Sequence, residues 1–276
     1  MQGGHLSRCH DLGKVVALKF AKVALRTRRI ALAAIAILVA TNACAWSNKL
    51  DSTAHIVLDS GHSPLQPGAL GAQGLYEVSY NDSLTAKVAS ALKSAGFNVT
   101  LTRTPLQEIT LDDRAQFANS AHADLFLAIH HDSTQLKYLE KFKVGKLDAY
   151  RTVTPMSGYS LYTSQLNPHF EQSLHFAKLL ASGLHDLGRP PAMHHAEPIA
   201  GENRELLDQN LGIYRYDQLL VLRKTDIPAV LLEVGVIPDQ KDEAYVSDEK
   251  NQTNITKAIV TAVQRYVSEI STVKAK

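Results

Sequence analysis

The chain has 276 residues, which is enough for one domain with a substantial hydrophobic core. Its formal charge of +2 comes from the first 45 residues, because the remainder holds 22 Lys or Arg against 26 Asp or Glu, a formal charge of −4. A mildly acidic body gives no electrostatic reason to expect a nucleic-acid partner. Both cysteines, Cys9 and Cys44, also lie in the first 45 residues, so any metal in the remainder must be held by His, Asp or Glu.

The first 45 residues have the pattern of a secretory signal peptide. An uncharged apolar stretch at 30–40 follows three arginines and precedes the tripeptide Ala-Cys-Ala at 43–45. Eleven apolar residues are too few for a spanning helix, which needs about 20, so we expect no stable membrane anchor. A lipoprotein anchor at Cys44 is the alternative, although the residues before it fit that signal poorly. We therefore expect 1–45 to be a signal peptide and 46–276 to be the exported domain.

Beyond residue 45, strand-like and helix-like runs alternate, which is typical of an α/β fold. A strand at 55–59 leads into a glycine-rich loop, and a helix at 79–95 follows and is ended by Gly96. The other expected elements are strands at 97–103, 123–129, 158–163 and 227–236, and helices at 111–121, 168–187 and 251–270. We predict a single domain with a mostly parallel, twisted sheet flanked by helices.

Two stretches fit this alternation poorly. Residues 133–157 are polar and carry four lysines, and residues 189–213 contain two adjacent prolines and several charges. Long irregular connections in compact domains are often lids or binding loops. A solvated surface excursion is the alternative interpretation for each stretch.

Three chemically important side chains follow or end expected strands. His62 follows the apolar run at 55–58, His130 follows the run at 125–129, and Glu233 follows the run at 229–232. In an open parallel sheet, the loops at the carboxyl ends of strands gather into one ligand-binding crevice. Glu77, near the start of the first helix, adds a further ligand. His62, Glu77 and His130 thus make the three-ligand set of a catalytic zinc site, which leaves a fourth position for water.

Glu233 is predicted to be the catalytic base. It ends a run of four apolar residues, where an unpaired buried carboxylate costs several kcal/mol. Zinc lowers the pKa of a bound water to about 7, so a nearby carboxylate can take its proton.

Several neighbouring residues have two interpretations. His131 competes with His130, but strand alternation lets only one of the two face the site. Asp59 either fixes the tautomer of His62 or caps the loop. Arg103 and Arg223 either contact an anionic substrate or form structural ion pairs.

A second group of metal-capable side chains lies at His194, His195 and Glu197. The segment that holds them is irregular, with no expected strand to position the side chains. We interpret it as the rim of a loop rather than as a second metal site.

Seven segments follow one family pattern in order and spacing: Val57–His62, Gly68–Gly71, Gly74–Glu77, Asn98–Arg103, Arg114–Asn119, Ala123–His130 and Pro228–Gly235. Together they resemble the zinc-dependent N-acetylmuramoyl-L-alanine amidases of type 3. The resemblance covers about residues 54–134 and 215–268. It implies that His62, Glu77 and His130 bind Zn²⁺ and that Glu233 is catalytic.

The resemblance also implies a substrate and a cellular location. The substrate is peptidoglycan, cut at the amide between the lactyl group of N-acetylmuramic acid and L-alanine, and the location is periplasmic or cell-wall associated. A carboxypeptidase-like zinc hydrolase of peptide stems is one alternative. A non-enzymatic regulator that binds the cell wall is the other.

The chain departs from the family pattern at Ser60 and Ser63, at His131-Asp132, and in the long segment 133–157. In some relatives, an inserted helix at this last place covers the zinc until an activator protein displaces it. We expect 133–157 to be such a lid or regulatory segment, with a carboxylate such as Glu140 in the open zinc position.

Overall fold

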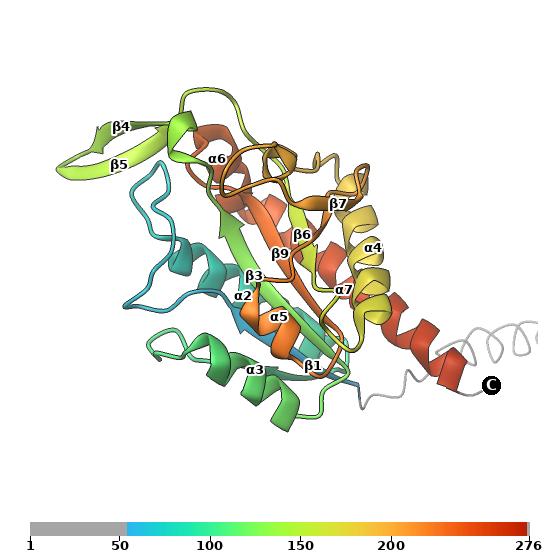
Figure 1. Cartoon of the computed structure of the whole chain (residues 1–276). Coiled ribbons are helices and arrows are strands. Elements are labelled where there is room, and N and C mark those ends of the chain that lie inside the picture. The colour runs from blue at the N-terminus through green and yellow to red at the C-terminus, as the bar shows by residue number, and fades with distance from the viewer. Residues whose placement is uncertain (1–53, 275–276) are drawn as a thin grey trace, which may run out of the picture. The chain divides into compact units, whose positions relative to one another are not determined.

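The computed structural model describes residues 54–274, which form a central sheet between two layers of helices (Figure 1). The predicted signal peptide lies outside the described residues. Within 54–274, no helix is both long and apolar enough to cross a lipid bilayer. The main sheet has seven strands in the order β2 (Asn98–Leu101), β1 (His55–Ser60), β3 (Leu125–Asp132), β9 (Ala229–Val236), β6 (Ser160–Thr163), β8 (Ile213–Arg215) and β7 (Glu205–Asp208).

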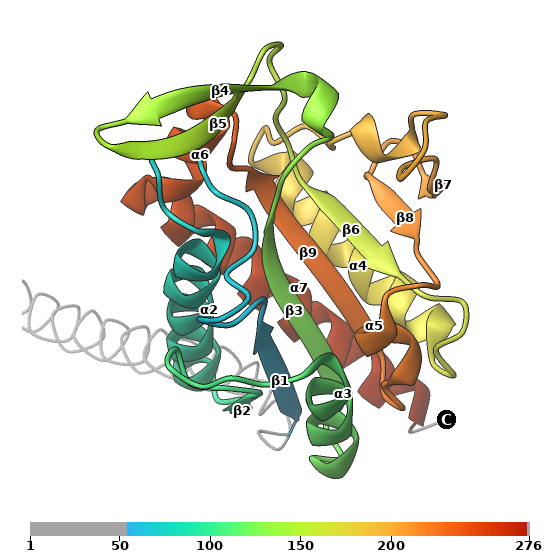
Figure 2. The ribbon, with the colours of Figure 1, turned by 60° about the vertical axis from the view of Figure 1, so that its left-hand side comes forward.

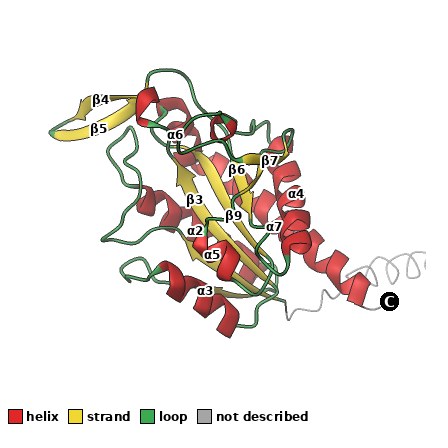
Figure 3. Cartoon of the chain, viewed as in Figure 1, coloured by secondary structure: helices red, strands yellow, loops and turns green. Residues whose placement is uncertain are grey.

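The helices cover both faces of this sheet (Figures 2 and 3). One face carries α2 (Glu77–Ser94), α4 (Phe170–Asp186) and α7 (Glu249–Lys274), and α7 packs against both α2 and α4. The other face carries α3 (Leu111–Ser120) and α5 (Leu220–Lys224), and α6 (Gln240–Ser247) follows the end of β9. The prediction of one α/β domain with a mostly parallel sheet is confirmed, since β2, β1, β3 and β9 pair in parallel.

The chain order explains why α2 and α3 lie on opposite faces. The chain leaves β1 through α2 to reach β2 on one side, then returns through α3 to β3 on the other side of β1. Because parallel crossovers are right-handed, reversing the direction of travel places the two helices on opposite faces. The loops after β1 and β3 therefore diverge at a topological switch point, where α/β folds bind ligands.

The central strands are apolar because helices cover them on both sides. Leu125 to Ile129 in β3 and Ala229 to Leu232 in β9 are all buried. A continuous apolar run of this kind is the pattern of a strand shielded on both faces. The polar residues that end these runs consequently come at the carboxyl edge of the sheet.

The segment 133–157 differs from the expectation of an inserted helical lid. Apart from the short 3₁₀ turn η1 (Leu136–Tyr138), it forms an antiparallel hairpin of β4 (Leu139–Val144) and β5 (Leu147–Thr152), which projects from the domain (Figure 1). Gly145 has a φ of +62°, the left-handed conformation that tight hairpin turns require. Glu140 on β4 pairs with Arg151 Nε on β5 at 2.7 Å. The prediction that Glu140 fills the open zinc position is therefore wrong.

The segment 189–213 is also more regular than expected. It contains the 3₁₀ turn η2 (His194–Ala196) and strand β7, and it leads into β8. Strand β6 pairs antiparallel with β9, and β7 pairs antiparallel with β8, so this side of the sheet is mixed.

Two buried arginines fix the loop that leaves β1. Arg114 Nη1 donates to Asp59 Oδ1 at 2.6 Å and to the Ser60 carbonyl at 2.7 Å, and its Nη2 donates to the His62 carbonyl at 2.5 Å. Arg103 Nε donates to the same His62 carbonyl at 2.8 Å, and its Nη2 pairs with Asp82 at 2.7 Å. The loop carbonyls are thus held by charged donors from α3 and from the end of β2.

Replacing Arg114 with Ala should destabilise the protein strongly. Asp59 is only 2% exposed and would keep a charge without its cation, which typically costs about 3–5 kcal/mol. Urea unfolding measures the change, with Arg223→Ala as the control. Arg223 is exposed and has no ion pair within residues 54–274, so its loss should stay within about 0.5 kcal/mol. Equal effects of the two substitutions would contradict the role given to Arg114.

Candidate active site

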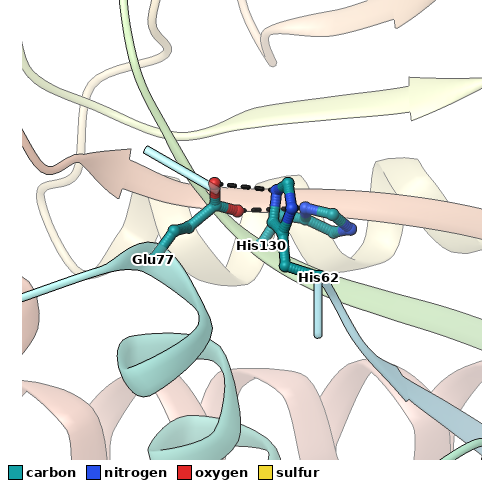
Figure 4. Close-up of side chains that lie close together, drawn as sticks. All are labelled: His62, Glu77 and His130. Carbon is teal, nitrogen blue, oxygen red and sulfur yellow. Dashed lines mark hydrogen bonds and ion pairs between the residues drawn. The ribbon is translucent and has the colours of Figure 1, made fainter. Parts of the chain in front are cut away.

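His62, Glu77 and His130 meet at the carboxyl edge of the sheet (Figure 4). His62 lies in the loop after β1, Glu77 is the first residue of α2, and His130 is near the end of β3. His62 Nε2 lies 2.9 Å from Glu77 Oε2, and His130 Nδ1 lies 3.1 Å from Glu77 Oε1. The three ligand atoms all lie within 4.8 Å of one another, so one ion can contact all three residues.

Glu77 is held as a charged carboxylate although it is buried. The backbone N–H of Ala69 donates to Oε2, and the backbone N–H of His131 donates to Oε1, both at 3.2 Å. Burial raises the pKa of Glu77, but the hydrogen bonds and charges of His130 and His62 outweigh it and hold the pKa far below its ordinary value. A carboxylate that stays ionised here is suited to a cation.

The tautomer of His62 is set by a backbone carbonyl rather than by Asp59. His62 Nδ1 lies 3.1 Å from the Gln66 carbonyl oxygen, which can only accept, so the proton sits on Nδ1 and Nε2 is left free as a ligand. Asp59 instead accepts from Arg114 and from the Thr102 hydroxyl. Asp59 therefore does not fix the tautomer of His62. Its contacts with Arg114 and Thr102 at the start of the loop agree with the second interpretation, that Asp59 caps the loop.

Two glycines leave the space that the imidazoles and the carboxylate occupy. A Cβ at Gly61 would lie 2.3 Å from His130 Cε1, and one at Gly68 would lie 2.4 Å from Glu77 Oε2. Gly68 also has a φ of +77°, which favours glycine. The ordered loop, the donor set and the charged Glu77 together fit a zinc ion held by two imidazoles and one carboxylate.

Glu233 lies beside this group with one carboxylate oxygen unpaired. In the parallel register of β3 and β9, Glu233 is directly opposite His130. Its Oε2 is buried and has no hydrogen-bond partner in the part of the chain that the structure describes. Burial, together with the charges of Asp132 and Glu77, raises the pKa of Glu233 well above its ordinary value. A perturbed carboxylate beside a cation site is a candidate proton acceptor.

His131 points away from this group, toward α2. Its Nδ1 lies 2.8 Å from Asn81 Oδ1, and its ring lies 5.6 Å from the ring of Tyr80. Only His130 of the two neighbours therefore reaches Glu77 and His62 with its side chain.

The other sequence candidates separate into different roles. Arg103 forms a structural ion pair with Asp82, which is one of its two interpretations. Arg223 is exposed and forms no ion pair among residues 54–274. Glu197 accepts a hydrogen bond from the Tyr138 hydroxyl and lies 3.4 Å from Lys137 Nζ, and its carboxylate is not part of the group that His194 and His195 form with Asp132. These two histidines are not on an open rim, since both are buried.

A cavity of about 600 Å³ opens beside the cluster. His62 and His130 lie at one side of it, and its floor is apolar, formed by α5 and the middle of β9. The residues that start α3 complete the wall. A bound molecule can therefore extend from the two imidazoles onto a largely hydrophobic surface.

The family described as N-acetylmuramoyl-L-alanine amidase matches residues 56–265. The chain belongs to this family. The match includes all four residues of the candidate site.

Individual relatives are distant but cover the domain. The chain is 25% identical over 237 residues to the N-acetylmuramoyl-L-alanine amidase AmiC of Neisseria meningitidis, which covers 77% of this chain. It spans about half, 52%, of that relative's length. The catalytic domain of the amidase CwlV from Bacillus (Paenibacillus) polymyxa is 26% identical, with a TM-score of 0.59 over 78% of this chain and 98% of that one.

A further structural neighbour is the CwlD amidase of Clostridioides difficile, solved in complex with the GerS lipoprotein. It is 22% identical with a TM-score of 0.57, and the match covers 78% of this chain and 98% of that one. At this identity the likeness concerns the fold.

Sequence reasoning missed two residues that position the site. The Gln66 carbonyl could not be found from residue type, because every residue carries one. Arg114 had a visible signal, since a charged residue on the inward face of an expected helix needs a buried partner.

Gly61→Ala should disturb the metal centre while leaving the fold intact. The added methyl group must push the His130 ring away from Glu77, so we expect zinc to bind roughly 10–100-fold more weakly. Competition with a chelator of known affinity measures the change. Gly183→Ala is the control, because its Cβ would meet Ala258 alone, at ordinary contact distances of 3.4 Å or more. Unchanged affinity of the Gly61 variant would contradict this placement of His130.

His131 should make the metal-free protein sensitive to acid. Burial, opposed by the charge of Glu77, lowers the pKa of His131 from 6.5 to about 3. The unfolded chain therefore takes up this proton first, and the free energy of unfolding falls as the pH drops below 6.5. One proton corresponds to about 1.4 kcal/mol per pH unit.

His131→Asn should remove this contribution. Urea unfolding of the chelator-treated protein between pH 6.5 and pH 5 should show a shallower pH dependence for the variant than for wild type. The control is His175→Asn, at an exposed histidine paired with Glu269. A wild-type slope in the His131 variant would show that this ring is not held neutral.

Proposed function

We propose that the chain is a zinc-dependent amidase that cuts the bond between the lactyl group of N-acetylmuramic acid and L-alanine in peptidoglycan. The observation that carries this proposal is the unpaired, buried Oε2 of Glu233, opposite His130 of the His62–Glu77–His130 group. The family and its named relatives support the substrate.

The chain's own residues divide the chemistry between them. His62 Nε2, His130 Nδ1 and the Glu77 carboxylate would hold the zinc ion. Zinc bound there would polarise the scissile carbonyl and make a neighbouring water molecule more acidic. Glu233 Oε2 takes the proton of the attacking water, and the protonated carboxyl then donates it to the departing alanine nitrogen.

The raised pKa of Glu233 suits this exchange. A carboxyl group that holds a proton more tightly than usual is a stronger base toward the attacking water, and it then carries the proton that the departing nitrogen needs. Glu77 has the opposite shift and stays charged. The same residue type thus serves as base in one environment and as ligand in the other.

We also propose the cellular location and the partner protein that the sequence indicates. Residues 1–45 act as a cleaved signal peptide, and 46–276 form the catalytic domain in the periplasm or at the cell wall. An activator protein is part of this proposal, supported by the complex between CwlD and GerS. The projecting hairpin β4–β5 is the regulatory segment in which we expected a lid, although Glu140 does not reach the site.

The test incubates zinc-loaded protein with purified peptidoglycan beside the Glu233→Gln and His62→Ala variants. Wild type should release stem peptides with a new N-terminal alanine, detected by mass spectrometry. Glu233→Gln should retain its zinc and lose turnover by several orders of magnitude, because the proton acceptor is gone. His62→Ala should lose both the metal at this centre and the activity.

Other products would redirect the assignment. Cleavage elsewhere in the stem would identify a peptidase, and Glu233→Gln with wild-type turnover would remove Glu233 from the mechanism. Intact peptidoglycan that the wild-type protein binds but does not cut would favour the non-enzymatic regulator. If the wild-type protein alone is inactive and cuts peptidoglycan once a partner protein is added, that partner is the activator.

A further inference from the structure

A second group of metal-capable side chains lies at the end of β3, two residues beyond His130. Asp132 Oδ2 is 2.7 Å from His195 Nε2 and 3.3 Å from His194 Nε2. All three residues are buried, and their ligand atoms lie within 4.8 Å of one another. We call these residues the Asp132–His194–His195 cluster.

The spacing of this cluster matches that of the first centre. Its two carboxylate-to-imidazole distances, 2.7 and 3.3 Å, bracket the 2.9 and 3.1 Å found around Glu77. Ligands about 2.05 Å from a tetrahedral zinc ion are separated by about 3.3 Å. One of the two distances already has this value, and the other needs an outward shift of about half an ångström.

The carboxylate of Glu202 holds the ring nitrogen of His195 that does not face Asp132. His195 Nδ1 lies 2.8 Å from Glu202 Oε2, while its Nε2 faces Asp132. Glu202 is held in turn by Arg204 and by Gln135 Nε2, the latter at 2.8 Å. A carboxylate on the far nitrogen fixes the ring of a metal-bound histidine and makes it a stronger ligand. Glu202 therefore accepts a hydrogen bond from His195 Nδ1, as the Gln66 carbonyl does from His62 Nδ1.

The His62–Glu77–His130 group and the Asp132–His194–His195 cluster are separate, because their other residues come from different connections at the carboxyl edge of the sheet. His62 and Glu77 come from the loop after β1 and from α2, whereas His194 and His195 come from η2, in the segment before β7. Only β3 contributes to both, through His130 and Asp132.

We propose that the Asp132–His194–His195 cluster is a second binding site for a divalent transition-metal ion, with zinc as the probe. Two imidazoles and one carboxylate suit zinc and its first-row neighbours. Binding needs both Nε2 atoms without a proton. The proton of His194 Nε2, which faces the Ser133 carbonyl at 3.2 Å, and the proton of His195 Nε2, which faces Asp132 at 2.7 Å, are therefore released to solvent when the ion binds. The ion would tie η2 to the end of β3.

Metal content of the purified chain tests the proposal. The protein is loaded with zinc, freed of loosely bound ions by gel filtration, and analysed by inductively coupled plasma mass spectrometry. Wild type should retain two equivalents, His195→Ala one, His62→Ala one, and the double variant none. Replacing zinc by Co²⁺ should give two sets of visible absorption bands, one lost in each single variant. A single equivalent in wild type that His62→Ala removes would overturn the proposal.

Further variants separate specific binding from surface binding and from misfolding. His175→Ala, at the exposed His175–Glu269 pair, should keep two equivalents. Glu202→Gln should weaken the second equivalent roughly 10–100-fold in a chelator titration. If His195→Ala does not fold, His62→Ala alone decides, since retained zinc supports the second site and its absence overturns it. A second equivalent that survives a folded His195→Ala would also overturn it.

The result is independent of the amidase proposal. Failure to cut peptidoglycan would leave the metal count unchanged, and a single retained ion would leave the assignment of His62, Glu77 and His130 intact.

Discussion

The site depends on charged donors that hold backbone carbonyls in the loop after β1. His62 has a φ of +63°, a left-handed conformation that costs a non-glycine residue of the order of 1–3 kcal/mol. Arg103 and Arg114 both donate to the carbonyl of His62, and Arg114 is in turn fixed by Asp59. Glycine would adopt this backbone without strain but would carry no imidazole. The two guanidinium groups therefore help to hold an imidazole side chain at a strained backbone position.

Charge is distributed unevenly across the edge of the sheet. Glu77 is surrounded by N–H donors and imidazoles, while Glu233 faces buried surface and the charges of Asp132 and Glu77. Because like charges in a poorly solvated place cannot all be stable, the proton preference of Glu233 rises as Glu77 and Asp132 stay ionised. The raised pKa of Glu233 thus comes first from its own burial and then from the charges of Asp132 and Glu77.

Much of the fold and of the site could be predicted from the sequence, because long apolar runs and glycine stops report buried strands and helix ends directly. The positions of His62, His130 and Glu233 at one edge of the sheet could be predicted because each residue interrupts or follows such a run. The hairpin of β4 and β5 was missed, since charged residues obscured the alternation of Phe142 and Val144 before the Gly145 turn. The contact of Asp132 with His195 could not be predicted, because no expected strand positions the segment that holds His195.

The pairing of His130 with Glu233 on adjacent strands has a consequence for how such a site can vary. The relative position of these two residues is set by the hydrogen-bonded ladder between β3 and β9, in the most buried part of the sheet. The surrounding connections, among them 133–157 and 189–213, can change in length or sequence without moving that pair. The geometry of this pair and the shape of the surrounding surface therefore depend on different parts of the chain, so loops can be remodelled around an unchanged His130–Glu233 pair.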